Sequence, residues 1–133
     1  MQLSSVRILV VDDFEPWRHF VSSLLLQKKP ELQVVGEASD GLEAVQKAVE
    51  LNPDLILLDI GLSTLNGIEA ARQIRKLVPD SKIIFLSQES DADVLQESLS
   101  LGAQGYVLKA KAGSELLAAV ETVISGKKFV SST

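Results

Sequence analysis

Five polar side chains that stand directly after short apolar runs have the right types for phosphoryl chemistry at a metal ion. They are Asp12, Asp13, Asp59, Ser87 and Lys109. Carboxylate oxygens are the ligands of hard cations such as Mg²⁺, and a carboxylate can also act as a nucleophile that forms an aspartyl phosphate. A hydroxyl and an ammonium group can bind the oxygens of the transferring phosphoryl group. An isolated Asp-Asp pair would instead indicate a solvated turn, so the prediction depends on whether the fold brings these groups together.

The apolar runs that precede these residues indicate buried strands. Most are continuous rather than alternating, which is typical of strands covered on both faces. The segments between them have helical spacing, and the alternation predicts an α/β domain of the (βα)5 type, with a parallel sheet between two layers of helices. Crossovers are right-handed, so the carboxyl ends of all strands share one edge, where we expect the five polar side chains to meet. The runs are 8–11, 32–35, 55–58, 83–86 and 106–108.

Local signals predict where the helices begin. Pro16 favours the first turn of the first helix. Asp40 with Glu43, and Asn66 with Glu69, have the spacing of capping boxes at the starts of the second and third helices.

The helical spacing also predicts the buried faces. We expect Phe20 on the first helix, and Leu42 and Val49 on the second, to face inward with their neighbours at helical spacing. The fourth helix, 91–101, has the thinnest apolar stripe, which Ser98 interrupts.

Composition excludes several classes of function. The chain has 133 residues and 46% hydrophobic side chains, which suits one domain with a real core. Its net charge of −5 argues against direct nucleic-acid binding. It has no cysteine, and no apolar run approaches the roughly 20 residues of a membrane span. We expect a cytoplasmic protein with a domain over 1–126 and a tail or linker over 127–133.

Five motifs stand at the predicted strand ends and in the loop after Asp59, at 11–13, 58–60, 66–67, 85–87 and 105–109. Together they resemble the receiver domain of bacterial two-component response regulators, over residues 6 to about 125. The resemblance implies a flavodoxin-like fold with strand order 2-1-3-4-5. The stretches 67–72, 102–109 and 126–129 resemble the NarL-like subfamily, which usually adds a C-terminal helix-turn-helix domain that binds DNA; no such domain is present in this chain.

The resemblance implies a role for each acidic residue. Asp59 would accept a phosphoryl group from the phosphohistidine of a sensor histidine kinase. Asp13 and Asp59 would bind Mg²⁺, or Mn²⁺ in its place, directly, and Asp12 through water. Gly61 would add its backbone carbonyl as a further ligand.

It also implies a switch. Ser87 and Lys109 would bind the phosphoryl group, and Tyr106 would pack inward as Ser87 moves toward it. The face formed by the helix 91–101, the strand 106–108 and the last helix would change, with homodimer formation on phosphorylation. Such a domain is not an enzyme in the usual sense, because it assists only its own phosphorylation and dephosphorylation.

Three residues depart from the family pattern, and two others stand alone in the chain. Ser63 replaces a usual proline, so the loop after Asp59 should be freer, and Gln88 replaces a small residue, so we expect altered dephosphorylation; both should modulate the site. Ala110 stands after Lys109 where many relatives carry proline, so we expect no cis bond there. Trp17, the only tryptophan, should lie near the acidic residues, whereas His19, the only histidine, should be a surface residue.

Other functions fit the sequence less well. An aspartate-nucleophile hydrolase of the haloacid-dehalogenase type needs a second Asp where Gly61 stands. An FMN carrier would not place acidic residues after the first strand, and a dinucleotide enzyme needs a glycine-rich motif there. The remaining alternative is a receiver fold that acts as a docking or dimerisation module without phosphorylation.

Overall fold

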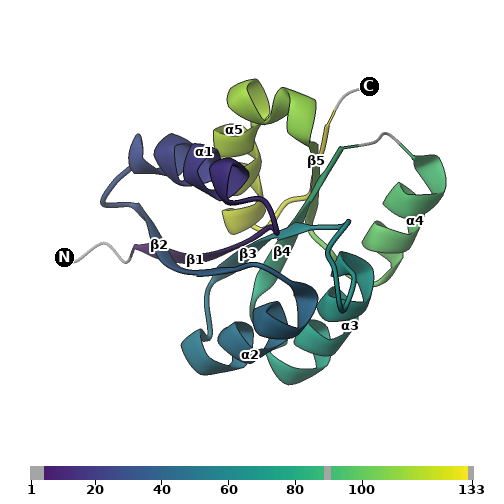
Figure 1. Cartoon of the computed structure of the whole chain (residues 1–133). Helices are drawn as coiled ribbons and strands as arrows, with labels where there is room; N and C mark the ends of the chain where they lie inside the picture. The colour runs from purple at the N-terminus through teal and green to yellow at the C-terminus, as the bar shows by residue number, and fades with distance from the viewer. Residues whose placement is uncertain (1–4, 89–90, 132–133) are drawn as a thin grey trace.

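The chain forms a central parallel sheet between two layers of helices (Figure 1), and the computed structural model describes residues 5–88 and 91–131. Helices α1 and α5 cover one face of the sheet, and α2, α3 and α4 lie on the other. All paired strands are parallel, in the order β2-β1-β3-β4-β5-β6. The strands are β1 Val6–Val11, β2 Leu32–Ala38, β3 Leu55–Asp59, β4 Lys82–Ser87, β5 Gly105–Leu108 and β6 Phe129–Val130, and the helices are α1 Glu15–Leu26, α2 Gly41–Leu51, α3 Gly67–Leu77, α4 Ala92–Ser100, the short 3₁₀ turn Lys109–Lys111 and α5 Ala112–Ile124.

A sixth strand corrects the predicted sheet. The order 2-1-3-4-5 holds for the first five strands, but β6 extends the sheet beyond β5. The amide of Phe129 donates to the Gln104 carbonyl at 3.1 Å, and that of Ser131 to the Tyr106 carbonyl at 2.8 Å. Part of the predicted tail therefore covers an edge that would otherwise leave backbone groups unpaired. A strand of two residues has no periodicity by which a sequence could reveal it.

The inner strands are buried on both faces, as the continuous apolar runs predicted. Leu9 and Val11 of β1 pack on the side of α2 and α3, whereas Ile8 and Val10 pack on the side of α1 and α5. The same alternation runs through β3 and β4. Each such aliphatic side chain contributes roughly 1.5–3 kcal/mol on burial, which makes these strands the rigid part of the fold.

Three residues predicted to face inward do not. Phe20 is 41% exposed, Leu42 54% and Val49 55%. The buried face of α2 is made by Gly41, Ala44, Val45 and Ala48, so the predicted inward positions of Val45 and Ala48 are confirmed. The small alanine side chains let α2 lie close to the sheet. With this face of the helix turned inward, the larger Leu42 and Val49 lie on the solvent side.

The predicted helix caps of α2 and α3 are confirmed. The Asp40 carboxylate accepts a hydrogen bond from the Glu43 amide at 2.8 Å, and the Asn66 side chain accepts one from the Glu69 amide at 2.9 Å. These bonds satisfy amide groups that the first turn of a helix leaves without a partner.

Helix α4 packs lightly, as its thin apolar stripe predicted. Val94 and Leu95 are only partly buried, and Ser98 is the one described residue of α4 that is fully enclosed. The Ser98 hydroxyl donates to the Val94 carbonyl at 2.7 Å, so its burial leaves no unsatisfied group. An element with so little buried apolar surface is held less firmly than its neighbours. No helix within the described residues has the length and apolar character that crossing a membrane requires.

Two glycines allow the loop between β3 and α3 to lie close to its neighbours. A Cβ atom on Gly41 would lie 1.7 Å from the Leu65 carbonyl oxygen, and one on Gly67 would lie 2.1 Å from the Asp59 carbonyl oxygen. The Gly67 amide also donates to the Ile60 carbonyl at 2.9 Å. The loop is thereby held against the end of β3, which carries Asp59.

Gly67→Ala should destabilise the domain because its methyl group would collide with backbone that cannot move without displacing β3. We expect the free energy of unfolding in urea to fall by about 1–3 kcal/mol. Gly61→Ala is the matched control, since nothing lies within 4 Å of the added Cβ, and it should change stability by less than about 0.5 kcal/mol. Equal effects of the two variants would contradict this account of the loop.

Candidate functional site

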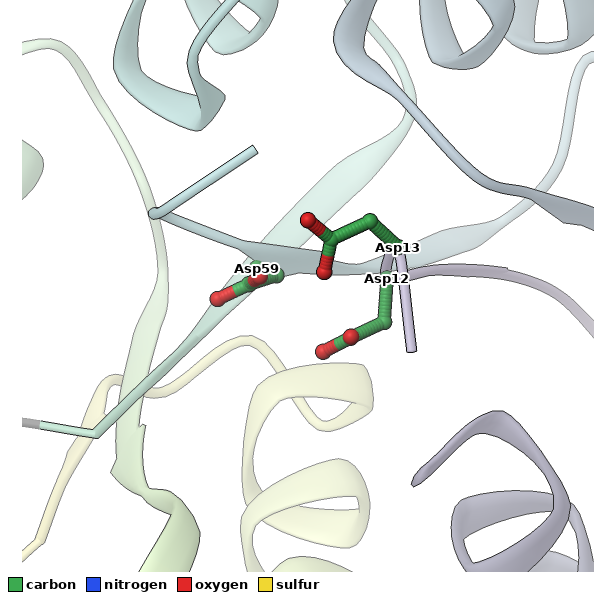
Figure 2. A group of neighbouring side chains, drawn as sticks. All are labelled: Asp12, Asp13 and Asp59. Carbon is green, nitrogen blue, oxygen red and sulfur yellow. The ribbon is translucent and has the colours of Figure 1, made fainter. Parts of the chain in front are cut away.

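Three carboxylates gather at the carboxyl ends of two adjacent strands (Figure 2). Asp12 and Asp13 follow β1, and Asp59 is the last residue of β3. Ligand atoms from the three side chains all lie within 4.8 Å of one another. Asp12 is 1% exposed and Asp59 6%, whereas Asp13 is open to solvent. The predicted cluster is therefore present, and β1 and β3 bring it together because they are hydrogen-bonded neighbours.

Asp12 is held by bonds to both its side chain and its backbone. Its carboxylate accepts a hydrogen bond from the Phe14 amide at 2.9 Å, and its own amide donates to the Ala38 carbonyl at 3.0 Å. Its carbonyl accepts a hydrogen bond from the Arg18 guanidinium at 2.6 Å. Arg18 also pairs with Glu37 at 2.8 Å, which ties α1 to the ends of β1 and β2.

Lys109 supplies the positive charge that opposes these acids. Its ammonium group donates to Asp12 Oδ2 at 2.6 Å and lies 3.6 Å from Asp59 Oδ1. The side chain is 12% exposed, so water screens these interactions less than it would at the surface. One ammonium against three carboxylates leaves the site with a net negative charge.

Burial is the main reason why the pKa of Asp59 is raised above its ordinary value of 3.8. The negative charges of Asp12 and, less strongly, Asp13 raise it further. Lys109 and a hydrogen bond from the Gly61 amide, at 3.3 Å, lower it. The raised pKa shows that the negative charge of Asp59 is disfavoured in the folded domain, first by burial and then by the neighbouring acids. With oxygen donors only, the residues present fit a hard divalent cation such as Mg²⁺.

An open cavity of about 750 Å³ lies over the carboxylates, with room for a phosphoryl group and part of its donor. Its lining includes the backbone of the β3–α3 loop at Gly61, the Ser87 side chain at the end of β4, and the exposed Gln88 next to it. The structure thus brings together most of the predicted site residues. They are Asp12, Asp13, Asp59, Gly61, Ser87, Gln88 and Lys109.

Three residues to which the sequence analysis gave a role or a position do not line this cavity. Tyr106 is buried in β5 and lines a smaller cavity, of about 140 Å³, between α4 and β6. Ser63 is exposed in the β3–α3 loop and is not among the residues that line the main cavity. His19 is exposed on α1, as predicted.

Trp17, predicted to lie near the acids, lines the main cavity. The Lys109 ammonium lies over its ring, 5.0 Å from the ring centroid, a contact that the sequence did not reveal. Arg18 and Glu37 received no role from the sequence. A basic side chain one turn after an acidic pair was the only signal for Arg18, and such residues are common on solvated helix faces.

Replacing Asp59 by Asn should stabilise the metal-free domain at pH 7. The folded-state pKa of Asp59 lies above the unfolded value, so folding is favoured while the carboxyl is protonated, and that contribution is lost as pH rises through the folded pKa. Asparagine keeps the shape without the charge. We expect a higher melting temperature for Asp59→Asn than for the wild type, with the difference shrinking as the pH falls toward 4.

The exposed Glu50→Gln on α2 serves as a control for loss of a negative charge far from the site. Mg²⁺ should stabilise the wild type more than the Asp59→Asn variant. A lower melting temperature for Asp59→Asn at pH 7 would contradict the electrostatic account.

Comparison with known proteins agrees with this geometry. A family model described as the response regulator receiver domain matches residues 8–121. The transcriptional regulatory protein LiaR of Bacillus subtilis (strain 168) is 38% identical over 122 residues, which are 92% of this chain and 57% of LiaR. The transcriptional regulatory protein DegU of Brevibacillus brevis is 35% identical over 127 residues, which are 96% of this chain and 53% of DegU. The chain therefore spans about half the length of these curated relatives.

Solved structures show the same family. A LuxR-family two-component response regulator from Aurantimonas sp. SI85-9A1 superposes with a TM-score of 0.88 at 32% identity, covering 95% of this chain and 89% of that one. The response regulator domain of Thermotoga maritima CheB gives a TM-score of 0.84 at 35% identity, covering 92% and 98%. The chain belongs to the response regulator receiver domain family of two-component systems, with relatives of the NarL/LuxR type.

Proposed function

We propose that this domain is a phosphorylation-controlled switch in which Asp59 accepts a phosphoryl group from a sensor histidine kinase. The observation that carries the proposal is the position of the Asp59 carboxylate: it lines an open cavity, 3.6 Å from the Lys109 ammonium and within 4.8 Å of two further acids. A nucleophile, a counter-charge and a cation site in one place are what phosphoryl transfer requires.

The transfer is a simple exchange of bonds at phosphorus. An Asp59 carboxylate oxygen forms a bond to phosphorus while the phosphorus–nitrogen bond of the phosphohistidine breaks, and that electron pair stays with the imidazole. Lys109 is placed to balance negative charge on the phosphoryl oxygens. Hydrolysis later reverses the switch: a water oxygen bonds to phosphorus, the bond to Asp59 breaks, and inorganic phosphate leaves.

Asp12, Asp13 and Asp59, with the Gly61 carbonyl, would hold Mg²⁺, or Mn²⁺ in its place. The cation would neutralise charge on the phosphoryl group. The raised pKa of Asp59 is consistent with this assignment: burial is its main cause, and a bound cation would relieve the additional repulsion from Asp12 and Asp13.

Ser87 and Tyr106 would form the switch pair. Ser87 lines the main cavity, and Tyr106 is buried one strand away, beside α4. The light packing of α4 supports a change on the α4-β5-α5 face. We propose that this face mediates homodimer formation on phosphorylation.

The output of the whole protein is proposed from its relatives. LiaR and DegU are named as transcriptional regulatory proteins, and this chain spans about half of each. We infer a cytoplasmic regulator in which a separate domain binds DNA, since the acidic receiver itself, with a net charge of −5, is unsuited to that contact.

Incubation with Mg²⁺ and acetyl phosphate, followed by intact mass measurement, tests phosphorylation. We expect a single phosphoryl adduct in the wild type that is absent from Asp59→Asn and is lost on removal of divalent cations with EDTA. The Glu50→Gln control should load like the wild type. If the folded wild type gains no adduct, the chain is better described as a docking or dimerisation module.

Gln88→Ala should shorten the life of the phosphorylated state, because removing this exposed side chain opens the cavity next to Ser87 to water. We expect decay of the adduct to accelerate by roughly twofold or more, equivalent to about 0.4 kcal/mol in the barrier. Gln96→Ala, an exposed glutamine on α4 that does not line the cavity, should decay at the wild-type rate. Identical decay in Gln88→Ala and the wild type would remove Gln88 from the proposal.

A further inference from the structure

We propose that Trp17 is a positioning residue for Lys109, with the face of its indole ring holding the ammonium group over the acidic site. This inference rests on the proposed function and deepens it. Lys109 Nζ lies over the Trp17 ring, 5.0 Å from the ring centroid, where the negative face of the ring attracts a cation. Because the lysine side chain is only 12% exposed, little water weakens that attraction.

Lys109 needs such a contact because its two carboxylate partners do not hold it equally. Its ammonium group is 2.6 Å from Asp12 Oδ2 but 3.6 Å from Asp59 Oδ1. A lysine is a point charge on a flexible chain, so ion pairing alone does not define its position. The indole ring adds a wall on one side of the ammonium group, which limits how far it can move from the space above Asp59.

Trp17 is itself held in place by its surroundings. Its ring packs against Phe20, with 5.1 Å between centroids and an interplanar angle of 42°. The neighbouring Arg18 clamps the first turn of α1 to the Asp12 carbonyl at 2.6 Å. The same bond therefore links the acidic site to the helix that carries the indole.

The buried indole N–H argues that the ring face, rather than a hydrogen bond, explains the tryptophan. Among the described residues, Trp17 Nε1 is enclosed and has no hydrogen-bond partner. An unpaired buried donor is unfavourable, and a leucine or phenylalanine would fill space here without it. What tryptophan supplies beyond those residues is the strongest cation-binding face of any side chain.

The first test uses the emission of Trp17, the chain's only tryptophan. Spectra of the metal-free wild type and of Lys109→Met are compared without any phosphoryl donor. Methionine keeps an unbranched side chain but removes the charge, so we expect the emission maximum or intensity to differ between the two proteins. Identical spectra would overturn the inference, because the ammonium would then not lie against the indole.

The second test compares Trp17→Leu with Trp17→Phe in loading from acetyl phosphate with Mg²⁺, after melting curves establish that both variants are folded. The leucine variant should show a maximal loading rate roughly 2- to 30-fold below that of the wild type. The phenylalanine variant, which keeps an aromatic face, should recover most of that rate. If the indole only fills space, the loading rate should not depend on whether the replacement at position 17 has an aromatic ring.

The outcomes separate the two proposals. If the wild type loads and the folded leucine variant loads equally fast, the positioning role is wrong and the phosphoacceptor function stands. If phenylalanine rescues no better than leucine, the ring face is not the cause, and the positioning role is again wrong. If the wild type gains no phosphoryl group, the phosphoacceptor function fails, and the positioning role falls with it.

Discussion

Repulsion among three carboxylates at one edge of the sheet is the constraint on which the rest of the site depends. Asp12 and Asp59 are nearly enclosed. The pKa of Asp59 rises first because burial disfavours its charged form, and then because the negative charge of Asp12 repels it. The ammonium group of Lys109 and hydrogen bonds from backbone amides partly offset the unfavourable burial and repulsion of these carboxylates. The compensation is incomplete, and the remaining negative charge would attract a divalent cation, whose positive charge would in turn offset that of a phosphoryl group.

The fold divides into a firm part that holds these charges together and a lighter part beside them. Strands β1, β3 and β4 are buried on both faces, and the glycines at 41 and 67 let the β3–α3 loop lie against the end of β3. Helix α4 buries little, and Tyr106 lies between it and the C-terminal strand. A switch of the proposed kind needs this combination, because the reacting groups must keep their places while a neighbouring surface changes.

The regular features of the fold could be predicted because they repeat along the chain. Continuous apolar runs located the first five strands, and Asp40 and Asn66 marked the starts of two helices. Prediction failed where the local pattern left a choice. Leu42 and Val49 fit a helical stripe, yet close packing through Ala44 and Ala48 rotates them outward. Strand β6 was missed because its stability comes from the free edge of β5, which the local sequence does not show.

The sequence by itself determined which strand-end residues reach the site, because a chain that alternates strands and helices must end its parallel strands at one edge, and the residue after each run is then known. Only the tertiary structure decided how those residues pair. Lys109 bonds to Asp12, 97 positions away, more closely than to Asp59, and its ammonium lies over Trp17. Arg18 joins Asp12 to Glu37. These choices depend on side-chain directions and on distances between separate elements, and neither is encoded in a local pattern.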